Sequence, residues 1–168
     1  MKQMTMHNFK FLCSLLLITL LLTNSTQASP YTISDDSQNV DSFIQHNLAL
    51  ERYDLVMFWA TFCGPCKRDF KKIAQLMQDN PDIHMTILGV VIDGEENPKL
   101  TESLVQQHQL DYAHVLTNFE AAAVYHQQAA DKNLIGTPSY LLYDHSNELV
   151  ADHPSMIDLD ALLMLVED

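Results

Sequence analysis

An abrupt change of hydrophobic pattern at Cys63 constrains the fold of this chain more than any other feature. Residues 53–60 (YDLVMFWA) form a nearly continuous apolar run, which is typical of a central strand buried on both faces. Over residues 63–78 the apolar positions recur at helical spacing, with lysines and an arginine between them. The change falls on Cys63-Gly64-Pro65-Cys66, which places two cysteines at a strand–helix junction.

The rest of the chain alternates between the same two patterns. Strands are expected at residues 83–92, 112–116, 139–143 and 148–151, and helices at 40–51, 100–110, 119–130 and 159–166. Alternation that ends in a hairpin and a helix predicts an α/β layer fold with a central mixed β-sheet flanked by helices. No linker divides the chain, so we expect one domain at 39–168 after a flexible lead-in at 29–38.

The first 28 residues have the layout of a secretory signal peptide. Lys2 and Lys10 form a positive segment before a twelve-residue apolar run at 11–22. Small residues then lead to a cleavage position after Ala28. The run is shorter than the ~20 residues that span a bilayer comfortably. If it is not cleaved, residues 11–22 would instead tether the protein to a membrane. In both cases we expect a periplasmic or otherwise extracytoplasmic protein.

Removal of this segment changes the cysteine and charge counts. Cys13 is lost, so Cys63 and Cys66 are the two cysteines of the mature chain. The full chain has 9 Lys and Arg against 22 Asp and Glu, a formal net charge of −13, which becomes −15 without Lys2 and Lys10. Because such a chain repels phosphate backbones, we expect no nucleic-acid partner.

The place of the cysteine pair favours thiol–disulfide chemistry. Free N–H groups and the macrodipole at a helix N-terminus stabilise a thiolate, so we expect a lowered pKa for Cys63, as the exposed nucleophile. Cys66, three residues later, would be more buried and would resolve the mixed disulfide. Pro65 fits the first helical turn, where its missing N–H is not needed.

Three other uses of the cysteine pair stay open at this point. A zinc site needs about four ligands, and the mature chain has no third cysteine. A structural disulfide across so small a loop would remove little chain entropy. Thiolates also suit copper, although no third ligand is evident. We favour redox use, with no metal and no cofactor besides a redox-active Cys63–Cys66 disulfide.

Two motifs resemble the thioredoxin superfamily. Residues 59–67 (WATFCGPCK) are similar to its active site, and Gly136-Thr137-Pro138 is similar to the cis-proline loop that faces the CxxC pair in that fold. The secretory segment and the extra helix-strand-helix at 98–130 resemble the TlpA/ResA/DsbE group of extracytoplasmic thiol reductases. The resemblance covers residues 38–168. It implies a thioredoxin-like fold with an inserted helix-strand element before the cis-proline strand.

The resemblance also implies roles for single residues. Cys63 matches the nucleophile, Cys66 the resolving cysteine and Pro138 the cis-proline. Thr137 would offer backbone edges to a substrate strand, and Trp59 matches an aromatic packed beneath the active-site loop, although a plain core role fits Trp59 as well. The expected substrate-binding residues are Thr137, Pro138, Gly64, Pro65 and Trp59.

One acidic residue departs from the thioredoxin pattern. Thioredoxins have a buried Asp six residues before the first cysteine, where this chain has Met57. The TlpA/ResA-like proteins often have Glu three residues after the second cysteine, where this chain has Asp69. We expect Asp69 to accept or supply the proton of Cys66. The alternative is that Asp69 is a solvated helix residue.

The Gly-Pro dipeptide between the cysteines resembles that of reducing thioredoxins. We therefore expect a reductase of disulfides in exported proteins, and the resemblance implies a DsbD-type membrane electron donor. The alternatives are a disulfide oxidant or isomerase of secreted proteins, and a copper-carrying chaperone on the same fold that is not an enzyme.

Overall fold

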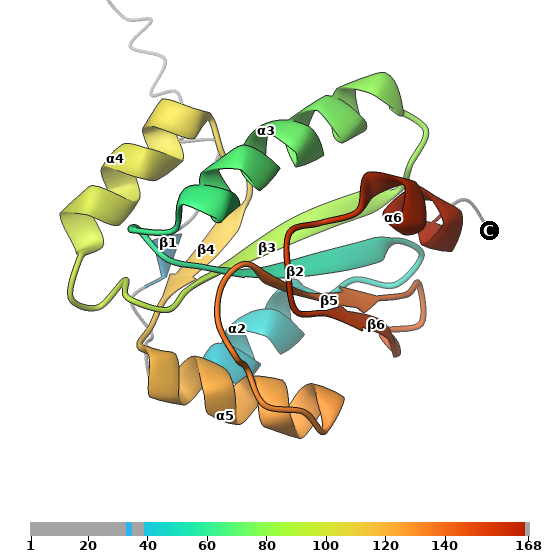
Figure 1. Ribbon diagram of the computed structural model, residues 1–168. Helices are drawn as coiled ribbons and strands as arrows, with labels where there is room; N and C mark the ends of the chain where they lie inside the picture. Colours follow the sequence, from blue (N-terminus) through green and yellow to red (C-terminus); the bar gives the residue numbers. More distant parts are fainter. Residues whose placement is uncertain (1–32, 35–38, 167–168) are drawn as a thin grey trace, which may run out of the picture.

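The computed structural model describes residues 33–34 and 39–166 of the 168-residue chain (Figure 1). The expected signal peptide at 1–28, with its candidate tether at 11–22, lies outside the described residues, as does most of the lead-in. Within the described ranges, no helix is both long enough and apolar enough to cross a membrane.

In the described part of the chain, six strands form one mixed sheet in the order β1-β4-β3-β2-β5-β6. The strands are β1 (Ile33–Ser34), β2 (Tyr53–Trp59), β3 (Met85–Val91), β4 (Ala113–Leu116), β5 (Ser139–Tyr143) and β6 (Leu149–His153). The pairs β1–β4, β4–β3 and β3–β2 are parallel, whereas β2–β5 and β5–β6 are antiparallel. This confirms the predicted α/β fold with a central mixed sheet.

Five helices within residues 39–166 cover the two faces of the sheet. They are α2 (Val40–Asn47), α3 (Gly64–Asp79), α4 (Pro98–His108), α5 (Phe119–Ala130) and α6 (Leu159–Val166). Helices α3, α4 and α6 lie on one face, and α2 and α5 lie on the other (Figure 1). Strand β2 is therefore covered on both sides, and six of its seven residues are buried. Its continuous apolar run follows from this position.

The structure departs from the sequence prediction at the N-terminal part of the domain. The helix expected at 40–51 ends at Asn47, because Leu48 adopts an extended conformation with ψ of 138°. Ile33 and Ser34, inside the expected lead-in, form β1 and pair with β4. A two-residue strand shows no alternation that a sequence pattern could reveal. Helix α4 and strand β4 form the expected inserted element, and β4 separates β1 from β3.

The register between β2 and β5 places two distant segments at one end of the sheet. Phe58, near the end of β2, pairs with Ser139 at the start of the antiparallel strand β5. The loop that leads to Cys63 and the Thr137-Pro138 segment therefore leave neighbouring strands at the same edge. The candidate site is built at this edge.

Candidate active site

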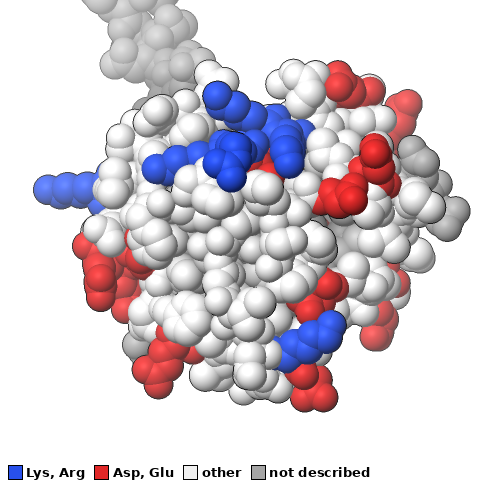
Figure 2. All heavy atoms as spheres, in the orientation of Figure 1, with Lys and Arg blue, Asp and Glu red and all other residues white. Residues whose placement is uncertain are grey.

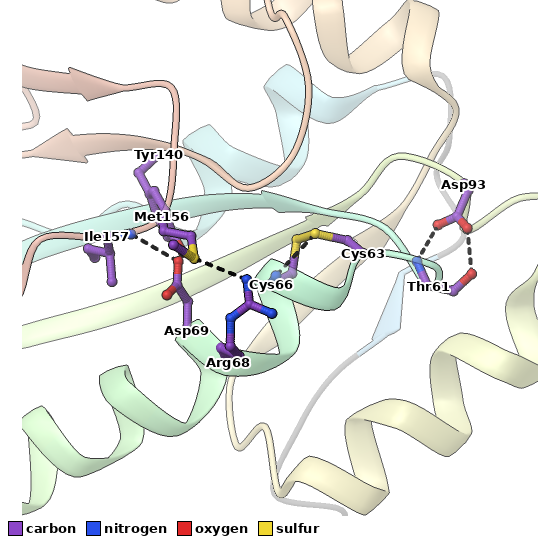
Figure 3. The surroundings of a disulfide bond; sticks show 9 residues. All are labelled: Thr61, Cys63, Cys66, Arg68, Asp69, Asp93, Tyr140, Met156 and Ile157. Atoms are coloured by element: carbon purple, nitrogen blue, oxygen red, sulfur yellow. Dashed lines mark hydrogen bonds between the residues drawn. A yellow bond between two sulfur atoms is a disulfide. The ribbon is translucent and has the colours of Figure 1, made fainter.

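Cys63 and Cys66 form a disulfide at the N-terminus of α3 (Figure 3). The S–S distance is 2.01 Å, and Cys63 is the N-cap residue of the helix. The backbone N–H of Cys66 donates a hydrogen bond to the Cys63 Sγ at 3.1 Å. The predicted helix N-terminus is confirmed, and so is the position of Pro65 in the first turn. An N–H directed at this sulfur would also stabilise a Cys63 thiolate.

Cys63 is less exposed than the sequence analysis expected. Its exposed fraction is 4%, against 0% for Cys66. The predicted order of burial is thus correct, but the description of Cys63 as an exposed residue is wrong for this disulfide form. The reason is that its sulfur is bonded to a fully buried partner, which holds the Cys63 side chain against the helix.

The loop before the disulfide is held by a carboxylate from the neighbouring strand. Asp93 follows β3, and its Oδ1 accepts from the Thr61 N–H at 2.9 Å while its Oδ2 accepts from the Thr61 Oγ at 2.5 Å (Figure 3). Asn97 donates in turn to the Asp93 carbonyl at 3.1 Å. Sequence reasoning missed Asp93. The available signal was that the carboxyl ends of neighbouring parallel strands meet at one edge, so a polar residue just after β3 comes close to the loop after β2.

The second motif lies at the start of β5. The Thr137–Pro138 peptide bond is cis, as the resemblance implied. Pro138 is buried, whereas Thr137 is half-buried and Gly64, in the CxxC turn, is exposed. Two large apolar side chains near these motifs, Phe62 and Ile135, are each 76% exposed. Sequence reasoning did not single them out, and the binding roles of Thr137, Pro138, Gly64 and Pro65 stay predictions.

Trp59 does not fit its expected role in substrate binding. Its side chain is fully buried at the end of β2, so it offers no surface to a substrate. Its ring packs edge-on against Phe70 at a centroid distance of 5.2 Å and against His114 at 5.8 Å. This corrects the prediction: Trp59 supports the active-site loop from within the core.

Asp69 is fully buried, which excludes the alternative of a solvated helix acid. Its Oδ2 accepts from the Tyr140 hydroxyl at 2.8 Å and from the Ile157 N–H at 2.9 Å, and its Oδ1 lies 3.4 Å from the Lys72 ammonium. Figure 3 shows the carboxylate one turn along α3 from Cys66, directed toward Tyr140 and Ile157. Its action on Cys66 stays a prediction.

Tyr140 keeps its proton in this arrangement. Burial raises the pKa of Tyr140 above its usual value, and the negative charge of Asp69 raises it further. The hydroxyl is therefore a permanent donor to the carboxylate across the relevant pH range. Tyr140 follows Pro138 by two residues, so β5 connects the cis-proline segment to the buried acid.

Met57, which stands in the place of the thioredoxin Asp, is fully buried. Among the described residues, no group of three or more His, Cys, Asp or Glu side chains is arranged to hold a metal ion.

Comparison with known proteins agrees with this geometry. No protein-family model matches the chain. Thioredoxin from Mycolicibacterium smegmatis is 34% identical over 70 residues, which cover 39% of this chain and 62% of that protein. The matched part therefore spans less than two thirds of this curated relative.

Solved structures match over a larger part of the chain. The thioredoxin domain of a thiol-disulfide oxidoreductase from Bacteroides vulgatus is 21% identical, with a TM-score of 0.55 and coverage of 68% of this chain and 79% of that one. A secreted disulfide oxidoreductase from Mycobacterium tuberculosis, homologous to DsbE of E. coli, is 17% identical, with a TM-score of 0.51 and coverage of 70% and 82%. These structures show that the chain has a thioredoxin-like fold, as the resemblance implied.

Proposed function

We propose that this protein is an exported thiol-disulfide oxidoreductase that reduces disulfides in other exported proteins. The observation that carries the proposal is the Cys63–Cys66 disulfide at the N-terminus of α3, on the same sheet edge as the cis Thr137–Pro138 bond. A buried structural disulfide would need neither the helix N-terminus nor the cis-proline segment. Both features suit a sulfur that alternates between thiolate and disulfide.

The reaction proceeds by two exchanges at sulfur. In the reduced protein the Cys63 thiolate attacks one sulfur of a substrate disulfide and forms a mixed disulfide with it. The other substrate sulfur leaves as a thiolate and takes up a proton. Cys66 then loses its proton and attacks the Cys63 sulfur, which releases the second substrate thiol. The substrate gains two electrons and two protons, and the protein ends with the Cys63–Cys66 disulfide. A dithiol donor at the membrane, of DsbD type, would return it to the reduced form.

Asp69 is the group that we assign to the proton of Cys66. It is a buried carboxylate three residues further along the same helix, and two donors occupy its Oδ2. Its Oδ1 has no hydrogen-bond donor among the described residues, only the Lys72 ammonium at 3.4 Å. That oxygen is available to take up a proton when Cys66 becomes the attacking thiolate.

Export is supported by the sequence and by one relative. The signal-peptide layout of residues 1–28 directs a chain out of the cytoplasm. The similar structure from Mycobacterium tuberculosis is described as secreted. An extracytoplasmic location in turn makes a membrane donor necessary for a reductase, because that compartment is oxidising.

A disulfide oxidant is the second candidate, and the basic residues next to the site favour it. Lys67 and Arg68 directly follow Cys66, and positive charge near the thiols stabilises the thiolate and therefore the reduced protein. The reduction potential, measured by equilibration with glutathione, separates the candidates. We expect a value near that of thioredoxin, roughly −270 mV. A value near −120 mV, as in strong oxidants, would reverse the assignment of direction.

Trapping of intermediates tests the chemistry itself. The Cys66→Ala variant should accumulate mixed disulfides with envelope proteins, since its Cys63 can attack but nothing resolves the product. Cys63→Ala in the same cells is the matched control and should trap none. Adducts in both variants, or in neither, would contradict the assignment of Cys63 as the nucleophile.

A single-turnover assay tests Asp69. In Asp69→Asn, release of the second substrate thiol should slow while formation of the mixed disulfide stays near the wild-type rate. The expected decrease is roughly 10²-fold, the lower end of the usual contribution of a positioned proton acceptor. Unchanged release kinetics would leave Asp69 with a structural role alone.

A further inference from the structure

The distribution of positive charge is the strongest feature that the proposed reductase reaction does not use. After residue 28 the chain has seven lysines and arginines against 22 acids, and four of the seven fall within six positions of α3. We call this set the basic face; it consists of Lys67, Arg68, Lys71 and Lys72. Figure 2 shows Lys and Arg gathered over α3, with acids spread over other parts of the visible surface.

The basic face extends along both flanks of α3, starting beside the disulfide. On one flank, burial together with the nearby Lys67 and Lys71 lowers the pKa of His108 on α4. On the other flank, the Arg68 guanidinium donates to the Met156 sulfur at 3.5 Å (Figure 3). The cations thus border the helix end that presents Cys63.

This cluster of positive charges does not stabilise the fold. Lys67 and Lys71 are spaced i,i+4, as are Arg68 and Lys72, and like charges at that spacing destabilise a helix. They also lie toward the positive end of the helix macrodipole. Lys72 pairs with Asp69, but no described carboxylate lies within ion-pair distance of the other three. Within the described ranges these three cations have no carboxylate partner, so they are able to bind an external one.

We propose that the basic face selects partner segments in which the reacting cysteines are flanked by acidic side chains. The proposal rests on the thiol-disulfide exchange proposed above. A segment that reaches Cys63 must lie next to the first turns of α3, where carboxylates would meet Lys67, Arg68 and Lys71. The exposed Phe62, which directly precedes Cys63, offers an apolar contact beside the disulfide, and the exposed Ile135 precedes the cis-proline segment on the same sheet edge.

Net charge alone leads to the opposite expectation, which makes the proposal testable. With its net charge of −15 after residue 28, the protein repels an acidic peptide at long range. Local attraction by the basic face must therefore exceed that repulsion. A membrane with anionic lipids is a different partner for such a patch. We favour a peptide because the cations lie on the helix that carries the disulfide, where a membrane would block access to it.

The test uses the reduced wild-type protein and three peptides that contain the same disulfide. Their flanking residues are four Glu, four Gln or four Lys, and peptide reduction is followed by chromatography of acid-quenched samples. At an ionic strength near 0.05 M, the Glu peptide should react roughly tenfold faster than the Gln peptide, and the Lys peptide more slowly. The Glu-to-Gln rate ratio should approach one at 0.5 M salt, because screening shortens the range of the attraction.

Variants separate the basic face from net charge. The triple variant K67Q/R68Q/K71Q should bring the Glu-to-Gln ratio to one or below. The ratio cancels any change in the intrinsic reactivity of Cys63, because both peptides use the same thiol. Lys71→Gln should lower the ratio more than the matched control Lys99→Gln, which removes one exposed lysine at the start of α4.

The outcomes are distinguishable from failure of the proposed function. If no peptide is reduced, the oxidoreductase proposal fails. If all three are reduced at equal rates, or if K99Q lowers the ratio as much as K71Q, the selection by the basic face is refuted. If the peptide rates are equal and the wild-type protein sediments with vesicles that contain phosphatidylglycerol, whereas the triple variant does not, the basic face binds a membrane surface instead.

Discussion

His114 should make the stability of this protein depend on pH in the weakly acidic range. The side chain lies on β4, fully buried, with its ring stacked on Tyr112 at a centroid distance of 4.5 Å and edge-on to Trp59. Its Nδ1 lies 2.8 Å from the Tyr112 carbonyl oxygen, to which the ring donates as Nδ1–H. The Nε2 has no hydrogen-bond partner in the described part of the chain. Protonation would place a charge there without an acceptor.

The magnitude follows from the difference between the folded and unfolded pKa. Burial lowers the pKa of His114 from 6.5 to about 4, although the hydrogen bond to Tyr112 acts in the opposite direction. Between these values the unfolded chain binds more protons than the folded one, so the free energy of unfolding decreases as the pH falls. At about 1.36 kcal/mol per pKa unit, the limiting loss is about 3.4 kcal/mol, of which about 2.5 kcal/mol is reached by pH 4.5.

Urea unfolding of the oxidised protein, followed by circular dichroism from pH 7.5 to 4.5, measures this loss. The His114→Gln variant removes the titrating group, so its stability should decrease less over the same range, by about 2.5 kcal/mol relative to wild type. Burial also raises the pKa of Asp54, but that contribution is common to both proteins and cancels in the difference. His84→Gln, at an exposed histidine, is the control and should follow wild type.

A difference between wild type and His114→Gln that stays constant across the pH range would refute the reasoning. In that case His114 would have to be protonated inside the fold or neutral in the unfolded chain at pH 4.5. A lower stability of His114→Gln at pH 7.5 alone would not matter, since lost packing shifts the whole curve without changing its slope.

Three further substitutions test other contacts by urea unfolding. Gly89→Ala should destabilise by about 1–3 kcal/mol, because its Cβ would clash with the His114 ring. A cost that persists unchanged in a His114→Ala background would contradict this cause. Asp93→Ala should destabilise by about 1–3 kcal/mol, because the Thr61 N–H loses its acceptor; a change below about 0.5 kcal/mol would mean that water replaces the carboxylate. Tyr140→Phe should destabilise by about 1.5–3 kcal/mol through the lost hydrogen bond to the charged Asp69 carboxylate, and an unchanged stability would show that this bond contributes nothing net.

The parts of the site that depend on neighbouring residues could be predicted from the sequence. The change of pattern at Cys63 fixes both the strand and the helix that meet there, since strand and helix periodicity are local properties. The cysteine pair at the helix N-terminus follows directly. Pro138 has no such local signal, and only the resemblance of Gly136-Thr137-Pro138 to a known motif pointed to it.

Tertiary contacts decided the rest, and the sequence does not encode them in any short window. Most aspartates are exposed, so residue type alone predicts an exposed Asp69. In the fold its Oδ2 accepts hydrogen bonds from Tyr140 and Ile157, which lie 71 and 88 positions further along the chain. The sequence around Trp59 is compatible with a side chain on a binding surface and with one in the core. Only its contacts with Phe70 and His114 show that it lies in the core. The partnership of Asp93 with Thr61 depends on β2 and β3 lying side by side, so the residues around Asp93 in the chain do not reveal it.

The pairing of Phe58 with Ser139 ties the formation of the site to completion of the central sheet. The cysteines and the cis-proline segment are separated by about 70 residues in the chain, and only this antiparallel register brings their strands together. A slip of one residue would turn the side chains of one strand to the opposite face. Contacts of such long sequence separation form late in folding, because the loop between them must close first. Recovery of the proposed thiol-disulfide exchange activity during refolding should therefore report on the assembled sheet rather than on the helix that carries the cysteines.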